Sequence, residues 1–134
     1  MELWQRDATD LLGLLERREA SAEEIARSVI ARIEEAEDSI HAFLIRTGDA
    51  AVRHARRVDK ARADGEPLPP LAGLPVAVKD VLCTKGIRTS AASKILESYR
   101  PPYDATAWEL LRDQRMVLLG KTNLDEFAMG SSTE

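Results

Sequence analysis

The segment Gly65–Pro70, with the sequence Gly-Glu-Pro-Leu-Pro-Pro, is the feature that most limits how this 134-residue chain can fold. Proline lacks a backbone N–H and fixes φ, so three prolines within six residues cannot continue a helix. The hydrophobic pattern also changes at this segment, from helical periodicity before it to short apolar runs after it. We therefore predict two parts, a helical N-terminal region over residues 1–66 and a core of strands and helices over residues 67–134.

The first part carries the signals of three helices and one strand. Asp7 or Thr9 can cap the first helix, and Ser21 with Glu24 has the spacing of a capping box that starts the second. Apolar residues then recur every three or four positions, as on one face of a helix: Ile25, Val29, Ile33 and Ala36. The short run 42–45 is a candidate strand, and a third helix is expected from about residue 49 to residue 63.

The second part alternates between strand and helix patterns, which is typical of an α/β fold. Residues 75–78 and 116–119 are short apolar runs that favour buried strands, and Gly120 is expected to close the second one. Between them, Asp104 can cap a helix over residues 105–115. A strand, a helix and a strand in this order indicate a right-handed parallel crossover. We therefore expect the first strands of a mixed β-sheet flanked by helices.

Composition and charge exclude several classes of protein. Hydrophobic residues make up 44% and charged residues 31% of the chain, which is typical of a folded domain. No apolar run is long enough to cross a membrane, and the single cysteine, Cys83, cannot form an internal disulfide. The net charge is −4, with no basic stretch that would bind nucleic acid unaided. These observations favour a cytoplasmic protein that does not bind membranes and that reaches RNA only through a partner.

Lys79 directly follows the apolar run 75–78, at the place where a parallel strand would end. Functional groups gather at the carboxyl ends of strands in open α/β sheets, but a lysine there is more often a surface residue with its ammonium group in water. A lysine acts as a base near neutral pH only when burial destabilises its charged form. A catalytic Lys79 therefore requires that the carboxylate of Asp80 is turned away from it or engaged elsewhere.

Residues 71–80, Leu-Ala-Gly-Leu-Pro-Val-Ala-Val-Lys-Asp, resemble the first signature stretch of the amidase-signature family. Further stretches are similar to one branch of that family, the A subunits of the aspartyl/glutamyl-tRNA amidotransferases: residues 92–97, 101–106 and 120–134. The resemblance implies that Lys79 completes a Ser–cis-Ser–Lys triad. In that role it accepts the proton that the bridging serine relays from the nucleophilic serine, and later returns it to the leaving ammonia.

The same resemblance implies the reaction and the partners. The A subunit hydrolyses glutamine or asparagine and supplies ammonia to a B subunit, which uses ATP and Mg²⁺ to activate Glu-tRNA(Gln) or Asp-tRNA(Asn). A small C subunit braces the pair, and the misacylated tRNA is reached through the B subunit. No cofactor is expected in this chain. Both triad serines lie after position 134 in the family, so we expect residues 1–134 to be inactive alone.

The family likeness also suggests that Met129, Gly130 and Ser131 line the substrate pocket. The alternative interpretation is structural, because Gly-Ser-Ser after a helix is a common turn in which hydroxyl groups bond to nearby backbone. The sequence leaves these two interpretations open.

Two other functions remain as alternatives. A stand-alone amidase of the same family would share Lys79, and a non-catalytic α/β scaffold domain would share only the fold. Other candidate residues carry weaker signals. Cys83 is expected to be a small buried side chain, His41 and His54 lack the company of other metal ligands, and Lys121 after Gly120 lacks the glycine spacing of a phosphate-binding loop.

Overall fold

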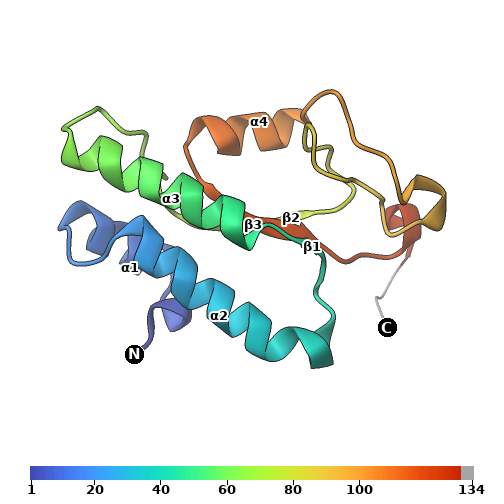
Figure 1. Cartoon of the computed structure of the whole chain (residues 1–134), viewed down its shortest axis with the longest axis horizontal. Helices are drawn as coiled ribbons and strands as arrows, with labels where there is room; N and C mark the ends of the chain where they lie inside the picture. The colour runs from blue at the N-terminus through green and yellow to red at the C-terminus, as the bar shows by residue number, and fades with distance from the viewer. Residues whose placement is uncertain (131–134) are drawn as a thin grey trace.

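The computed structural model describes residues 1–130 as a small three-stranded sheet with helices packed around it (Figure 1). The helices are α1 (Ala8–Glu16), α2 (Ala22–Ile40), α3 (Gly48–Ala63) and α4 (Thr106–Asp113). The strands are β1 (Phe43–Arg46), β2 (Pro75–Lys79) and β3 (Val117–Thr122). Three short 3₁₀ helices complete the described part, η1 (Leu3–Gln5), η2 (Lys94–Leu96) and η3 (Glu126–Ala128).

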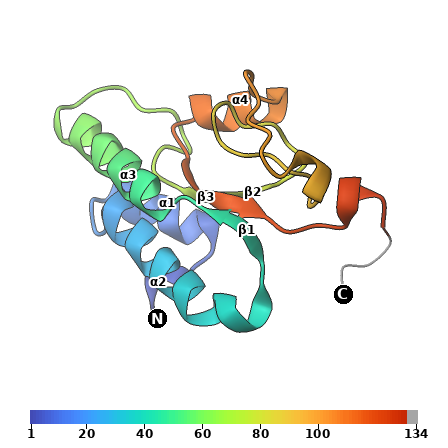
Figure 2. The ribbon, with the colours of Figure 1, turned by 45° about the vertical axis from the view of Figure 1, so that its right-hand side comes forward.

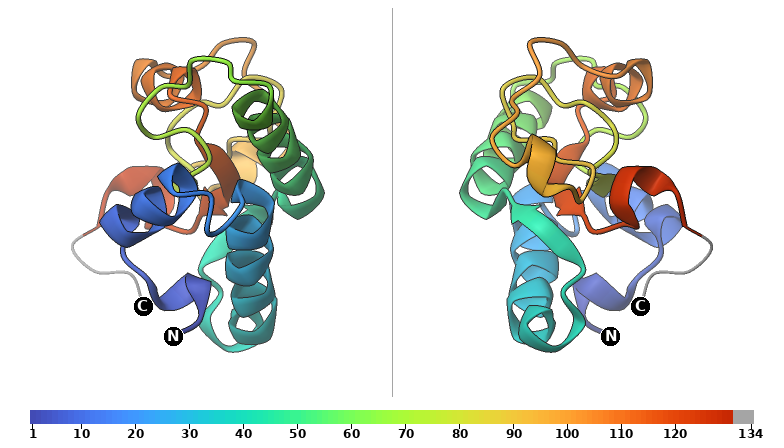
Figure 3. Two further views of the ribbon diagram at one scale, coloured as in Figure 1. Left: turned by 90° about the vertical axis from the view of Figure 1, so that its left-hand side faces the viewer. Right: turned by 90° about the vertical axis from the view of Figure 1, so that its right-hand side faces the viewer.

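The sheet has the order β1-β3-β2, with β3 in the centre. β2 and β3 are parallel and are joined through α4, which confirms the parallel crossover, while its right-handed sense stays a prediction. β1 is antiparallel to β3, so the sheet is mixed. Viewed along the sheet, α4 lies on one side of it, α1 and α2 lie on the other, and α3 runs beside α2 (Figure 3). The predicted fold class is therefore confirmed.

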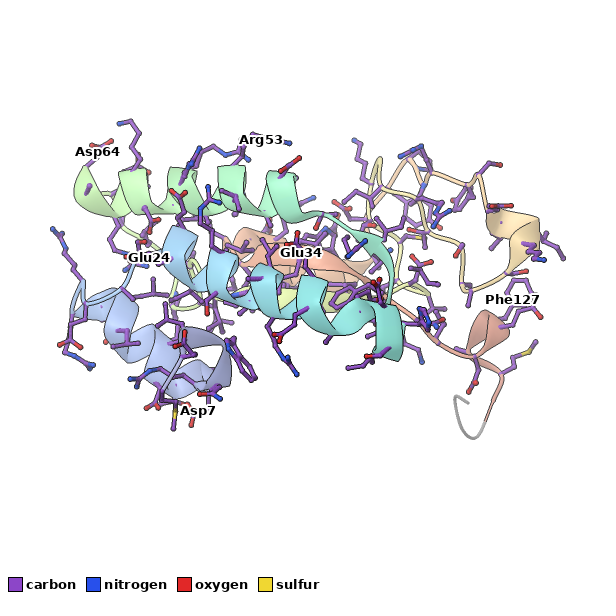
Figure 4. The ribbon with its side chains drawn as sticks, turned by 60° about the horizontal axis from the view of Figure 1, so that its bottom comes forward. Asp7, Glu24, Glu34, Arg53, Asp64 and Phe127 are labelled. Carbon is purple, nitrogen blue, oxygen red and sulfur yellow. The ribbon has the colours of Figure 1, made fainter. Side chains whose placement is uncertain are left out.

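Local sequence signals start the first two helices as predicted. The side chain of Asp7 accepts a hydrogen bond from the N–H of Asp10 at 2.8 Å and caps α1. Ser21 and Glu24 form the complete capping box of α2, because each side chain accepts a hydrogen bond from the backbone N–H of the other residue. Figure 4 labels Asp7 and Glu24 at these two helix starts. The predicted strand at 42–45 and the predicted third helix are found as β1 and α3.

Two predicted details are wrong. Asp104 does not cap α4, which begins after Ala105 without a side-chain cap. Instead, Asp104 accepts a hydrogen bond from the N–H of Lys85 at 2.5 Å and forms an ion pair with Arg112, so it ties the preceding loop to the helix. Gly120 does not end the second strand, because β3 continues through it to Thr122.

The core is built by both parts of the chain. Its fully or nearly buried members come from α1, α2, α3, β3 and the residues just before β2 and β3: Leu11, Leu15, Ala22, Ile25, Ala26, Ala51, Ala55, Leu74, Met116, Val117 and Leu119. Apart from Met116 these are aliphatic, and aromatic residues make up only 4% of the chain. The division at residues 66 and 67 stays a prediction from the sequence. None of the helices described over residues 1–130 has the length and apolarity needed to cross a membrane.

Asp59 joins α3 to the start of α2. Its two carboxylate oxygens accept hydrogen bonds from the N–H groups of Ala22 and Glu23, at 2.7 and 2.9 Å. The first N–H groups of a helix have no partner within the helix, so this carboxylate supplies a second cap besides Ser21.

We expect Asp59→Ala to lower the free energy of unfolding by about 1–2 kcal/mol, the usual cost of losing a helix cap. Chemical denaturation of the two proteins measures the difference. Asp64→Ala is the matched control, because among residues 1–130 the side chain of Asp64 forms only an exposed ion pair with Lys60, whose loss should cost under about 0.5 kcal/mol. Equal effects of the two substitutions would contradict the capping role of Asp59.

Candidate active site

Lys79 is the last residue of β2, at the edge of the sheet where the carboxyl ends of β2 and β3 meet. Ala77 and Lys79 are exposed, whereas Val78 between them is buried. Successive residues of a strand point to opposite faces, so Lys79 projects from one face of the sheet and Val78 from the other. The parallel register places Lys121 of β3 beside Val78, on the face that Lys79 does not use.

Asp80 follows Lys79 and is fully buried on the face opposite Lys79. Its Oδ2 accepts hydrogen bonds from the N–H and the hydroxyl of Ser90, at 2.9 and 2.6 Å. Its backbone N–H donates to the carbonyl of Thr122 at 3.1 Å, and its own carbonyl accepts the N–H of Ala91 at 3.0 Å. The condition that Asp80 must be engaged away from Lys79 is therefore met.

The partner of Asp80 is Lys121, whose side chain is also fully buried. Its Nζ lies 3.1 Å from Asp80 Oδ1, so the two side chains form an ion pair, but the contact does not have the angle of a hydrogen bond. The three N–H groups of the ammonium point instead to the carbonyl of Leu82 at 2.9 Å, Thr84 Oγ1 at 3.0 Å and Thr89 Oγ1 at 2.9 Å. Lys121 therefore joins β3 to the loop that follows β2.

Two opposing effects act on the charge of Lys121. Burial lowers the pKa of Lys121, while the carboxylate of Asp80 acts to raise this pKa again. The carboxylate of Asp80, 3.1 Å away, favours the ammonium form, whose three N–H donors match the three oxygens around it, two of which are hydroxyl groups that can also donate. We therefore describe the pair as a charged, buried ion pair in which every donor of Lys121 is used.

The segment 90–93 and η3 form a strained junction next to Asp80. Four non-glycine residues there have positive φ: Ala91 at 50°, Ala92 at 55°, Phe127 at 54° and Ala128 at 58°. The N–H of Phe127 donates to the carbonyl of Ala91 at 2.9 Å, and a hydroxyl–carboxylate hydrogen bond joins the same two segments. Left-handed backbone costs about 1–2 kcal/mol per non-glycine residue, and such strain clusters at functional sites.

The remaining predicted site residues follow η3. Met129 and Gly130 are exposed, and they follow η3, which is hydrogen-bonded to Ala91 and lies beside η2 in Figure 2. A Cβ atom at Gly130 would overlap Asp125 Oδ2, so a larger residue there would displace that carboxylate. Ser131, like Ser132 and Thr133, lies outside the described residues. The lining of a substrate pocket by these residues stays a prediction.

Lys79, segment 90–93 and η3 thus meet at one end of the sheet, through Asp80. Sequence reasoning placed Lys79 but missed the buried pair of Asp80 and Lys121, as well as the three hydroxyl groups around it. The one signal for this pair in the sequence was that each of the two apolar strands has charged residues within it or directly after it. Which two of them pair depends on the register of β2 against β3, which no local pattern specifies.

The other candidate residues do not assemble into a site. Cys83 is half-buried rather than fully buried as predicted, and it is a free thiol. Burial lowers the pKa of His54 on α3 and so favours the neutral imidazole. Among residues 1–130, no group of three or more His, Cys, Asp or Glu side chains is placed to hold a metal ion. Three hollows on the described surface involve α2, α3 or α4, and Lys79 lines none of them.

The chain is similar to several known proteins. The model of the Amidase family matches residues 24–134. The chain is 52% identical over all 134 residues to the A subunit of the glutamyl-tRNA(Gln) amidotransferase of Moorella thermoacetica, and it covers 28% of that protein. It is 55% identical over 133 residues to the corresponding A subunit of Salinispora tropica, a match that covers 99% of this chain and 27% of the relative.

A solved structure shows the same arrangement of elements. The chain is similar to the native peptide amidase of Stenotrophomonas maltophilia with a TM-score of 0.84 and 32% sequence identity. The match covers 92% of this chain and 26% of the peptide amidase. The chain therefore spans about a quarter of the length of the proteins it matches.

Proposed function

The chain belongs to the amidase family, and from this premise we propose that it is the opening part of the ammonia-supplying subunit of a tRNA-dependent amidotransferase. The observation that carries the proposal is the 52–55% identity over almost the whole chain to proteins named as the A subunits of glutamyl-tRNA(Gln) amidotransferases. The proposed reaction is hydrolysis of the side-chain amide of glutamine, or of asparagine. The ammonia then converts Glu-tRNA(Gln) to Gln-tRNA(Gln), and in some settings Asp-tRNA(Asn) to Asn-tRNA(Asn).

In this proposal Lys79 is the base of a Ser–cis-Ser–Lys triad whose serines lie beyond residue 134. Its position at the end of β2 supports the role, because groups at the carboxyl ends of parallel strands face a common cleft. The engagement of Asp80 with Ser90 and Lys121 supports the role too. The carboxylate of Asp80 is then not available to stabilise the charged form of Lys79, which would keep Lys79 from acting as a base. The role further requires that the rest of the protein buries Lys79, because burial lowers the pKa of a lysine and so favours the neutral amine.

The amide donor would bind beside the strained junction of segment 90–93 and η3. Met129, Gly130 and Ser131 are the residues we assign to that pocket. The support is the hydrogen bonding of η3, which directly precedes Met129, to segment 90–93 next to Asp80.

The proposed partners are the B and C subunits of the amidotransferase, in the cytoplasm. ATP and Mg²⁺ would be bound by the B subunit, with no cofactor held by residues 1–134. The charge distribution supports contact with tRNA through the B subunit, because the net charge of the chain is −4 and a protein that grips RNA unaided needs a basic face.

A stand-alone amidase is the second candidate function. The TM-score of 0.84 to a peptide amidase favours it as far as the fold is concerned. The higher identity to the amidotransferase subunits favours the first candidate. A non-catalytic scaffold domain remains the alternative from a different class, and Lys79 would then have no reaction to serve.

One experiment separates these functions. The full-length protein is purified with and without its B and C subunits, and glutamine hydrolysis, transfer of ammonia to Glu-tRNA(Gln), and hydrolysis of small aryl amides are measured. We expect glutamine hydrolysis and tRNA-dependent amide transfer in the complex. Hydrolysis of small amides without any transfer would favour the stand-alone amidase, and a folded full-length protein without any hydrolysis would favour the scaffold.

A further inference from the structure

The ion pair between Asp80 and Lys121 is the most deeply buried charged group that the structure describes, and the proposed reaction makes no use of it. Two buried charges are costly to take out of water, and apolar residues of similar volume often replace such a pair without loss of stability. Stability alone is therefore a weak explanation for the pair. Its position directly behind Lys79 points to another role.

We propose that Asp80 and Lys121 are positioning residues, which hold the end of β2 and segment 90–93 so that Lys79 projects at a fixed angle into the site. This inference rests on the proposed function of Lys79 as the base.

The backbone of Asp80 is the first group that fixes the position of Lys79. It is bonded on both sides, with its N–H donating to Thr122 of β3 and its carbonyl accepting from Ala91. Lys79 is the residue between this doubly bonded peptide and the ladder of β2 with β3. Backbone hydrogen bonds on either side of Lys79 therefore fix the direction of its Cα–Cβ bond. The side chain of Lys79 takes part in none of these hydrogen bonds.

The carboxylate of Asp80 is the second group, and it fixes the position of segment 90–93. It accepts both donors of Ser90, and charge-assisted hydrogen bonds of this kind are about twice as strong as neutral ones. They hold Ser90 immediately before Ala91, which has a φ of 50° and would relax to a right-handed or extended backbone if released. Because η3 bonds to the carbonyl of Ala91, a release would also move η3.

Lys121 closes the arrangement from β3. It neutralises Asp80, and its three N–H groups hold the loop after β2 at Leu82, Thr84 and Thr89. A methionine at position 121 would fill the same space but donate to none of these oxygens. The fully buried side chains of Asp80 and Lys121 therefore connect the two strands, the loop after β2 and segment 90–93.

The test uses the full-length protein in its complex, with Asp80→Asn, Lys121→Met and the double variant. Either single change leaves one buried charge unpaired and can prevent folding, so the double variant, which removes both charges, carries the test. The control is the double variant Lys60→Met, Asp64→Asn, which removes an exposed ion pair at the C-terminal end of α3. Thermal melts, amide hydrogen exchange of Ser90 and Ala91, and kcat and KM for glutamine are measured for each protein.

We expect the double variant of Asp80 and Lys121 to remain folded at the assay temperature, although its melting temperature falls because the three hydrogen bonds of the ammonium are lost. Exchange at Ser90 and Ala91 should rise at least about tenfold, because the bonds that protect them weaken. The kcat should fall about 10²-fold with KM changed less than about threefold, as for a reacting group displaced by about 1 Å. The control should match the wild type in all four measurements.

Unchanged exchange at Ser90 and Ala91, or increased exchange with a normal kcat, would overturn the inference. A kcat that falls only in proportion to the folded fraction would also overturn it, since the pair would then be purely structural. Failure of the proposed function is recognised separately, because the wild-type complex would then hydrolyse no glutamine while the exchange experiment still reports on the pair.

Discussion

Replacing Lys79 with alanine in the full-length protein is expected to lower the rate of glutamine hydrolysis by about 10²–10⁴-fold, the usual contribution of a general base. Lys79 ends β2 and is exposed among residues 1–130, so its removal takes away no packing within this part, and the melting temperature of the full-length protein should change little. Steady-state hydrolysis of glutamine, with the melt recorded on the same sample, measures both effects.

Arginine at position 79 makes this test specific. Lys79→Arg keeps the positive charge and most of the length of the side chain, but a guanidinium stays protonated at any pH the protein tolerates and cannot accept a proton. We expect this variant to be as inactive as Lys79→Ala. Lys85→Ala is the matched control, because Lys85 is an exposed lysine in the loop after β2 and should be dispensable. A near-normal rate with arginine would disprove the assignment of Lys79 as the base.

Gly120→Ala is expected to cause a large loss of stability for the addition of a single methyl group. A Cβ atom at position 120 would overlap the backbone carbonyl oxygen of Ile45 and would lie 2.8 Å from the ring of Phe43. The first contact is with backbone, so no side-chain rotation relieves it, and β1 must separate from β3. We expect the free energy of unfolding to fall by about 3 kcal/mol, the upper end of the cost of overpacking a core.

Gly48→Ala is the control for this substitution. A Cβ atom at Gly48 would meet only the side chain of Ile30, at an ordinary contact distance of 3.7 Å, and Gly48 is the first residue of α3. Alanine is the better helix former, so this change should be neutral or slightly stabilising. Denaturant titrations of the two variants give the comparison. A Gly120→Ala protein as stable as Gly48→Ala would show that β1 and β3 leave room for a side chain between them.

Local sequence patterns were enough to place the helix starts and the order of the elements. Asp7 and Ser21 could be identified as caps because their hydrogen bonds join residues three positions apart, within reach of any local pattern. Lys79 could be singled out because its signature stretch is contiguous. The alternation of apolar runs and helical periodicity was enough to predict a parallel crossover, because few topologies accommodate that order.

Contacts between distant residues became visible only in the folded chain. Asp104 has the residue type of a helix cap, yet it accepts a hydrogen bond from Lys85 and pairs with Arg112, because the loop after β2 returns beside α4. Gly120 looked like the end of a strand, and it is a glycine because β1 passes too close for any side chain.

Asp80 and Lys121 are far apart along the chain, and only the parallel register of β2 and β3 brings them within 3.1 Å of each other. Moving either strand by one residue would turn one of the two side chains to the opposite face of the sheet, so the composition of each strand could not reveal the pair. Local hydrogen bonds follow from the order of residues, whereas a buried charge pair depends on how whole strands align, and that alignment is fixed by the core they share.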